Sequence, residues 1–431
     1  MDGGEQVLTE LTADQVRWRC EPADLGFQTT TTLQPLATIV GQARAVDALQ
    51  FGLNIADHGF NIYVAGPPGT GKTTAVKTFL EEKAKDMPRP DDWCYVHNFA
   101  DSYRPWALRL PAGRGRQLKQ DMEMLITRIK QEIRRAFESD EYSTLRQEVT
   151  AQYQGRQEAL FNRLGKRAKE AGFVVQGTPT GFLIIPLTEE GKPMTEEQFR
   201  ELPEEVRKAI QQRRERVEEE LREVVSEVRK LQKEAAERLE EVDRQVALYA
   251  IGHLFDELLN RYQGIDRVNE YLNAVREDVL ANIDQFRTEP SVPAQMPFLA
   301  PIIQMQAFRK YEVNVVVDNA ETEGAPVVLE LNPTYTNLFG RLEKETQFGA
   351  LYTDFTLIKA GSLHRANGGY LVLQVEDVLR NLFVWDGLKR ALQSGQLTVE
   401  EPGERLGFIS TKSIMPEPIP LYVKVMLIGS P

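Results

Sequence analysis

The residues best suited to chemistry are eight consecutive positions, Gly-Pro-Pro-Gly-Thr-Gly-Lys-Thr at 66–73. They match the phosphate-binding pattern G-x-x-x-x-G-K-[ST] in full. In this pattern the glycines let backbone N–H groups turn towards phosphate oxygens, and the following helix adds the positive end of its dipole. Lys72 is predicted to reach the β- and γ-phosphates, and the Thr73 hydroxyl to hold Mg²⁺. The predicted nucleotide-binding residues of this segment are Gly66, Pro67, Pro68, Gly69, Thr70, Gly71, Lys72, Thr73 and Thr74.

Turnover of a bound nucleotide needs an acidic residue at the end of a neighbouring apolar strand. The natural candidate strand, 369–373, is followed by Gln374 and Val375, and acids come only at Glu376 and Asp377. Strand alternation would keep Glu376 on the same side as Gln374, about 7 Å further along, so that the two acids form a displaced catalytic site. Alternatively, they begin the next helix, where acidic residues are favourable. Both interpretations stay open, so the sequence predicts nucleotide binding without deciding turnover.

Other candidates for chemistry each have a structural alternative. A basic run could contact phosphate or a neighbouring subunit, or form a solvated loop; it comprises Arg104, Arg109, Arg114, Arg116 and Lys119. The apolar run 182–185 could grip unfolded polypeptide or pack on nearby helices. The histidines lack the spacing of metal ligands and favour structural roles; they are His58, His97, His253 and His364. No Ser, Cys or His constellation indicates a nucleophilic site.

The composition excludes several classes of protein. The 431 residues include 52 Lys and Arg against 64 Asp and Glu, and the net charge of −12 argues against non-specific nucleic-acid binding. No apolar run approaches the roughly 18 residues of a membrane-spanning helix, and the start lacks the pattern of a secretory signal. Cys20 and Cys94 are the only cysteines, which excludes a disulfide scaffold and fits a reducing cytosol. We therefore expect a cytoplasmic protein without a membrane partner.

A strand, a glycine-rich loop and a helix must position the phosphate site. Residues 61–65 form a short apolar run typical of a strand, and 73–85 suit a helix. The predicted fold class is α/β, a mostly parallel sheet with flanking helices. Its other predicted elements are a helix at 39–53, strands at 311–318, 325–331 and 368–375, a helix at 382–395 and a last strand within 421–431. Because a central strand is a poor place for a sheet to end, we expect the chain to be a fragment.

Between about 116 and 290 the sequence changes to long helical patterns rich in Glu, Arg, Lys and Gln. From Val217, apolar residues recur in alternating steps of four and three, the seam of a coiled coil, with a stutter around Ala235. Residues 172–187 contain two β-type runs around a Gly/Thr/Pro turn, which predicts a β-hairpin at the tip of an arm. The expected organisation is a lead-in, a first core part, a coiled-coil insertion carrying the hairpin and a second core part, at 1–35, 36–115, 116–295 and 296–431.

Several of these motifs resemble a known family. IVGQARAVDAL followed by GPPGTGKTT is similar to the arrangement of AAA+ proteins, in which the segment at Ile39 and Val40 lies by the adenine. The segments beginning DDWCYVHNF at 91, LNPTYTNLFGRLE at 331 and TDFTLIKAGSLHRANGGYLVL at 353 closely resemble Lon-like proteases whose AAA+ core is split by a long helical insertion. The resemblance implies an ATP-dependent, cytosolic, hexameric serine protease. Its ring would feed unfolded polypeptide to a C-terminal domain with a Ser–Lys dyad.

The sequence departs from this family pattern in ways that leave three functions open. The protease domain and the small lid would follow residue 431, Gln374 and Val375 stand where typical AAA+ ATPases have Asp-Glu, and Ser430 stands at the sensor position. The first function is the ATP-binding, substrate-handling portion of a Lon-like protease that degrades unfolded or damaged proteins. The second is a nucleotide-gated oligomeric scaffold that binds ATP without hydrolysing it. The third is a coiled-coil DNA-repair ATPase, whose Leu-Ser-Gly-Gly-type signature this sequence lacks.

Overall fold

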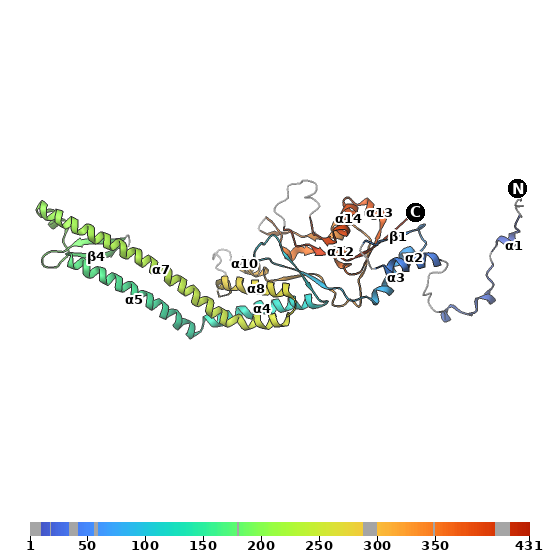
Figure 1. Cartoon of the computed structure of the whole chain (residues 1–431), viewed down its shortest axis with the longest axis horizontal. Coiled ribbons are helices and arrows are strands. Elements are labelled where there is room, and N and C mark those ends of the chain that lie inside the picture. The colour runs from blue at the N-terminus through green and yellow to red at the C-terminus, as the bar shows by residue number, and fades with distance from the viewer. Residues whose placement is uncertain are drawn as a thin grey trace. The chain divides into compact units, whose positions relative to one another are not determined.

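The structure is a computed structural model of the whole chain (Figure 1). It describes residues 10–17, 19–33, 42–55, 59–178, 181–287, 300–347, 350–400 and 414–431. The chain divides into two compact units, Met1–Ile62 and Tyr63–Pro431. No helix within the described ranges is long and apolar enough to cross a membrane.

The first unit contains short helical elements and one longer helix. The elements are α1 (Ala13–Val16), the 3-10 turns η1 (Pro22–Leu25) and η2 (Thr30–Thr32), and α2 (Ala43–Asn54). Helix α2 buries Leu49 and Leu53, two positions of the predicted helical pattern. The helix expected over 39–53 therefore exists and begins at Ala43; Ile39 and Val40, predicted to lie by the adenine, fall outside the described residues.

A four-stranded sheet carries the predicted phosphate segment. Its strand order is β1-β15-β12-β7, with bounds β1 (Ile62–Ala65), β7 (Val327–Glu330), β12 (Tyr370–Gln374) and β15 (Lys424–Gly429). Strand β12 pairs in parallel with β15 on one side and β7 on the other, so that Leu371 lies opposite both Val425 and Val328. The first four residues of β12 are buried, as expected for a parallel strand covered on both faces. The predicted parallel α/β sheet is confirmed.

Helices lie between the strands of this sheet along the chain. They are α3 (Lys72–Lys85), α11 (Tyr335–Phe339), α12 (Ser362–Arg365), α13 (Val375–Arg380) and α14 (Val384–Ser394). Helix α14 confirms the amphipathic helix predicted at 382–395: it buries Val384, Leu388 and Ala391 at helical spacing. These side chains join Leu371 and Leu373 of β12 in one apolar core.

A second sheet is antiparallel, which corrects the expectation of a single, mostly parallel one. Its order is β3-β2-β6, from β2 (Asp92–Val96), β3 (Trp106–Leu110) and β6 (Val313–Val317). The predicted strand 311–318 thus exists but pairs antiparallel with β2. Local sequence cannot decide this, because an apolar strand suits either kind of sheet when both of its faces are covered.

The helical region forms an arm of two long helices. Helix α5 (Asp140–Glu170) packs along the 58-residue α7 (Glu204–Arg261), and Figure 1 shows them side by side. Buried seam positions of α7 are Val217, Val224, Val228, Leu231 and Val242. Ion pairs cross between the helices at Arg156–Glu234, Arg163–Glu227 and Arg167–Glu220, so the helices run antiparallel within one chain. We call α5, α7 and the hairpin between them the two-helix arm.

The hairpin predicted at 172–187 is present in the two-helix arm. Strands β4 (Phe173–Thr178) and β5 (Gly181–Pro186) pair antiparallel, and α6 (Glu196–Arg200) follows them. At the other end of α7, a large core joins it to the antiparallel sheet and to α4 (Arg114–Phe137), α8 (Asp266–Ala281) and α9 (Ile283–Arg287). The remaining elements are α10 (Ala300–Arg309), β8 (Arg341–Leu342), β9 (Glu345–Gln347), β10 (Ala350–Tyr352), η4 (Phe355–Leu357), β11 (Ile358–Lys359), β13 (Gln396–Leu397) and β14 (Ile419–Pro420).

Candidate nucleotide-binding site

The predicted strand, loop and helix are all present around the phosphate motif. Strand β1 ends at Ala65, the loop follows, and α3 begins at Lys72. Gly69 and Gly71 have φ angles of 80° and 75°, in the left-handed region that side chains other than glycine rarely enter. These two residues turn the chain into α3. Pro67 and Pro68 have no N–H, so the donors of the loop are the amides from Gly69 onwards.

Lys72 spans this loop from the first turn of α3. Its Nζ donates to the carbonyl oxygens of Gly66 at 2.6 Å and Pro67 at 2.7 Å, and the Thr70 hydroxyl donates to the Pro67 carbonyl at 2.9 Å. The loop thus holds the ammonium group at its centre. Binding a phosphate would require Lys72 to exchange these carbonyls for phosphate oxygens, which offer it a charge-assisted hydrogen bond.

The end of β12 meets the start of α3. The Nε2 of Gln374, the last residue of β12, donates to the Thr73 hydroxyl oxygen at 3.2 Å. Thr73 is the residue predicted to hold Mg²⁺. The structure therefore brings together the phosphate loop and the strand that the sequence singled out for a catalytic acid, but the side chain at the meeting point is a neutral amide.

The two acids after β12 belong to a helix, not to an extended strand. Strand β12 ends at Gln374, and Glu376 and Asp377 lie in the first turn of α13. The position expected from strand alternation is therefore wrong, because the chain turns into a helix at Val375. This agrees with the alternative interpretation. A catalytic role for Glu376 and Asp377 stays a prediction.

Glu376 is engaged by the end of β15. Its Oε1 accepts from the Ser430 backbone N–H at 3.0 Å and from the Ser430 hydroxyl at 2.8 Å. Hydrogen bonds from its own backbone N–H and from Ser430 lower the pKa of the Glu376 carboxyl, so it stays ionised. Asp377 pairs with Arg380 at 3.6 Å.

Two residues that the sequence did not single out complete this network. The Tyr63 hydroxyl donates to the Ser430 carbonyl at 2.6 Å, and the Gly66 N–H donates to the Gly429 carbonyl at 3.2 Å. A Cβ added at Gly429 would lie 2.3 Å from Val375 Cγ1, so the close approach requires glycine here. A glycine at the end of an apolar strand was the only sequence signal for this contact.

The residues present do not complete a Mg²⁺ site. Protein-bound Mg²⁺ is usually held by one or two carboxylates besides phosphates and water. Thr73 offers a hydroxyl, but its neighbour Gln374 carries no charge. Over the described part of the chain, no group of three or more His, Cys, Asp or Glu side chains could hold a metal ion. The ligand role predicted for Thr73 stays a prediction.

The histidines and the basic run have structural contacts. His364 is fully buried, its Nδ1 accepts from the Gly361 N–H at 3.2 Å, and burial lowers its pKa to about 3. Burial, followed by the charge of Lys310, also lowers the pKa of His97. His58 falls outside the described residues. Ion pairs occupy several members of the basic run, namely Arg104–Asp101, Arg109–Asp91 and Arg116–Asp318.

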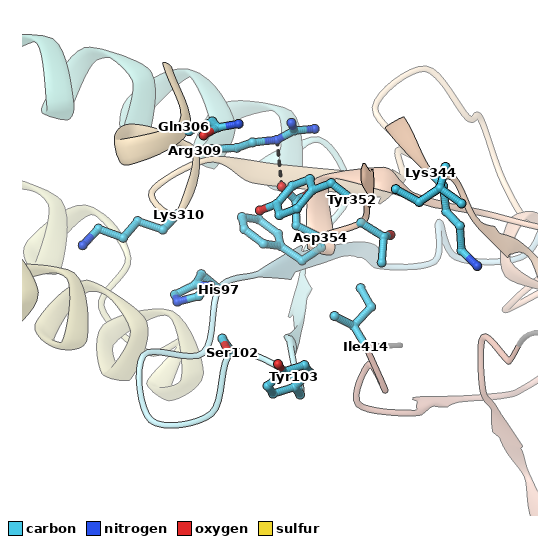
Figure 2. Close-up of a pocket in the computed structure, with 13 residues that line it drawn as sticks. His97, Ser102, Tyr103, Gln306, Arg309, Lys310, Lys344, Tyr352, Asp354 and Ile414 are labelled. Atoms are coloured by element: carbon cyan, nitrogen blue, oxygen red, sulfur yellow. Dashed lines mark ion pairs between the residues drawn. The ribbon is translucent and has the colours of Figure 1, made fainter. Parts of the chain in front are cut away.

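A cavity of about 350 Å³ lies between α10 and the segment after β10, and it contains no residue of the phosphate loop. Figure 2 shows Arg309 reaching Asp354 beside Tyr352, with an Arg309 Nε to carboxylate distance of 2.9 Å. Lys310 pairs with Asp278 at 2.6 Å. Arg309 and Lys310 are thus each paired with a carboxylate, and Lys344 also lines the cavity.

Two segments of the chain match models of known protein families. Residues 323–431, which include β7, β12 and β15, match the family model described as a LonB-like AAA domain. Residues 92–125, which include β2, β3 and the start of α4, match the Lon-like LonC helical domain. A search of curated proteins finds no match. These two matched segments indicate a Lon-like AAA+ protease family member.

Proposed function

We propose that this chain is the ATP-binding and substrate-handling portion of a Lon-like serine protease that degrades unfolded or damaged proteins. The observation that carries the proposal is the phosphate loop on β1 and α3, with Lys72 held at its centre. The loop amides and Lys72 bind the phosphates, and the N-terminus of α3 adds its dipole. A homo-hexamer, a cytoplasmic location and a proteolytic Ser–Lys domain elsewhere in the protein belong to the same proposal.

A specific contact favours the second function, binding of ATP with little or no turnover. Gln374 stands beside Thr73 where an acid would be needed, and the nearest following acid, Glu376, is engaged by Ser430. On this proposal ATP stabilises an oligomer and does not drive unfolding. Proteolysis would then be limited to chains that are already unfolded.

The two-helix arm is the proposed contact for polypeptide. In its hairpin Phe182 is 42% exposed and Leu183 is 52% exposed, whereas Ile184 is buried. The apolar run therefore packs on the arm through Ile184 and through the contact of the Phe182 and Phe161 rings, whose centroids are 5.5 Å apart, whereas Leu183 and part of Phe182 face solvent. Exposed apolar side chains of this kind suit the apolar segments of an unfolded chain.

The first test is ATP binding by isothermal titration calorimetry, with Lys72→Ala and the control Lys77→Ala. Lys77 lies one turn later on α3, is 54% exposed and pairs with Glu81. Loss of a charge-assisted hydrogen bond should weaken binding by roughly 10- to 100-fold in Lys72→Ala. Lys77→Ala should bind like the wild type. Equal affinities for the wild type and Lys72→Ala would contradict the proposed phosphate site.

A second test concerns turnover and substrate. Phosphate release by the wild type should stay near background. Replacing both Phe182 and Leu183 by Ser should weaken binding of unfolded casein, whereas Leu145→Ser should not; Leu145 is a 45% exposed residue elsewhere on the arm. Lys72-dependent phosphate release would instead favour an ATP-driven unfoldase. A salt-sensitive gel shift with DNA would favour the DNA-repair alternative.

A further inference from the structure

The contact between Thr73 and Gln374 affects whether the phosphate loop can bind a Mg²⁺ ion together with a nucleotide. The Gln374 Nε2 is 3.2 Å from the Thr73 hydroxyl oxygen and donates to it. A Mg²⁺ ion bound through Thr73 would need a lone pair of the same oxygen. The Gln374 amide hydrogen takes one of the two lone pairs of this oxygen and places a partial positive charge beside the position of the cation. Either orientation of the amide group leaves this position uncharged.

The carboxylates around this edge of the parallel sheet are engaged elsewhere. Glu376 accepts two hydrogen bonds from Ser430, and Asp377 pairs with Arg380. Glu330, the last residue of β7, accepts from the Ser362 hydroxyl and lies 3.7 Å from Arg365. Among the described ends of β7, β12 and β15, no carboxylate contacts Thr73 in place of Gln374.

We propose that this phosphate loop binds its nucleotide without requiring Mg²⁺, and that Gln374 sets this preference. The inference rests on the proposed nucleotide binding. Lys72, the loop amides and the N-terminus of α3 provide the positive charge that the phosphates need. Gln374 keeps the Thr73 hydroxyl in place and supplies no negative charge that would attract a divalent cation.

The decisive experiment compares ATP affinity of the full chain in excess EDTA and in millimolar Mg²⁺. The wild type should bind with dissociation constants that agree within about threefold. Gln374→Asp places a carboxylate beside Thr73, so its ATP affinity should be at least tenfold higher with Mg²⁺ than with EDTA. Gln374→Asn, a neutral side chain of the same length as Asp, should show no such gain.

A second readout uses Mn²⁺ as the probe and needs no catalytic activity. The electron paramagnetic resonance signal of free Mn²⁺ falls when the ion joins a protein–nucleotide complex. At equal ATP saturation, adding protein should reduce this signal more for Gln374→Asp than for the wild type or Gln374→Asn. Thermal unfolding of each variant shows whether it is folded.

Two results distinguish failure of this inference from failure of the proposed function. If wild-type ATP binding weakens tenfold or more in EDTA, the inference is overturned and the proposed function stands. If the wild type binds ATP under neither condition, both are overturned. The wild-type comparison needs no substitution, so it decides whether Mg²⁺ is required even where Gln374→Asp does not fold. A folded Gln374→Asp that gains no ATP affinity from Mg²⁺ would overturn the role of Gln374.

Discussion

The phosphate loop after β1 and the end of β12 meet at Thr73 and Gln374. The two regions differ in whether they carry the residues that their predicted roles require. The loop keeps its left-handed glycines, its lysine and its helix N-terminus. The end of β12 has an amide where a catalytic acid would be expected, and its following acids lie in a helix. On the proposed function, binding and turnover would depend on different residues, because backbone amides and a lysine hold the phosphates, whereas turnover needs a placed carboxylate.

The largest expected effect comes from giving the end of β12 the missing acids. The double variant Gln374→Asp/Val375→Glu should release phosphate from ATP at least about 100-fold faster than the wild type, since a positioned acid–base group contributes rate factors of this order. A coupled phosphate assay measures it. Adding Lys72→Ala to the double variant should return the rate to background. An unchanged rate in a folded, ATP-binding double variant would show that missing acids do not limit turnover.

The next prediction concerns Gly429, whose close packing against Val375 and Tyr63 connects the end of β12 with the strand before the phosphate loop. Gly429→Ala adds a Cβ that would lie 2.3 Å from Val375 Cγ1 and 2.8 Å from the Tyr63 hydroxyl oxygen. We expect the free energy of unfolding to fall by about 1–3 kcal/mol, as in other overpacked sites. Urea unfolding measures it. Gly165→Ala on α5 is the control: nothing lies within 4 Å of its added Cβ, and alanine should stabilise that helix slightly.

A pH effect is expected on the β12 side. The pKa of buried His364, in α12 just before β12, is about 3 and lies below its ordinary value of 6.5. The unfolded chain therefore binds this proton more readily, so stability is lost as the pH falls from about 6.5 towards 3, by at most about 1.4 kcal/mol per pH unit. His364→Asn should reduce this slope in urea unfolding between pH 6.5 and 4.5. His253→Asn, at an exposed position of α7, should keep it.

The smallest expected effect concerns the contact that engages Glu376. Ser430→Ala removes the hydroxyl donor at 2.8 Å but keeps the backbone N–H donor at 3.0 Å. One solvent-exposed hydrogen bond is lost, so the free energy of unfolding should fall by less than in Gly429→Ala. ATP affinity should change by less than threefold. A change of tenfold or more would show that Ser430 contacts the nucleotide directly.

The predictions agree best with the structure for elements formed by residues that are close together in the chain. The phosphate loop lies between a strand and a helix that are its chain neighbours, and the φ angles of Gly69 and Gly71 suit its turns. The two-helix arm follows from a period of apolar residues and the β-type runs between its helices. Of the two interpretations of Glu376, the helix start agrees with the structure, and the other fails because it extends a strand pattern past the residue where helix α13 begins.

The phosphate loop, the helices of the arm and the neutral residue Gln374 can be recognised in the sequence, because each depends on residue type and short spacing. The contact of Gln374 can be known only from the folded chain, since its partner Thr73 lies 301 positions earlier. Tyr63 and Ser430 are 367 positions apart, and β6 also pairs with β2, a strand far from it along the chain. Such contacts depend on which strands pair in the sheet. Strand pairing depends on how whole strands and helices bury their apolar faces, and a local sequence pattern does not specify it.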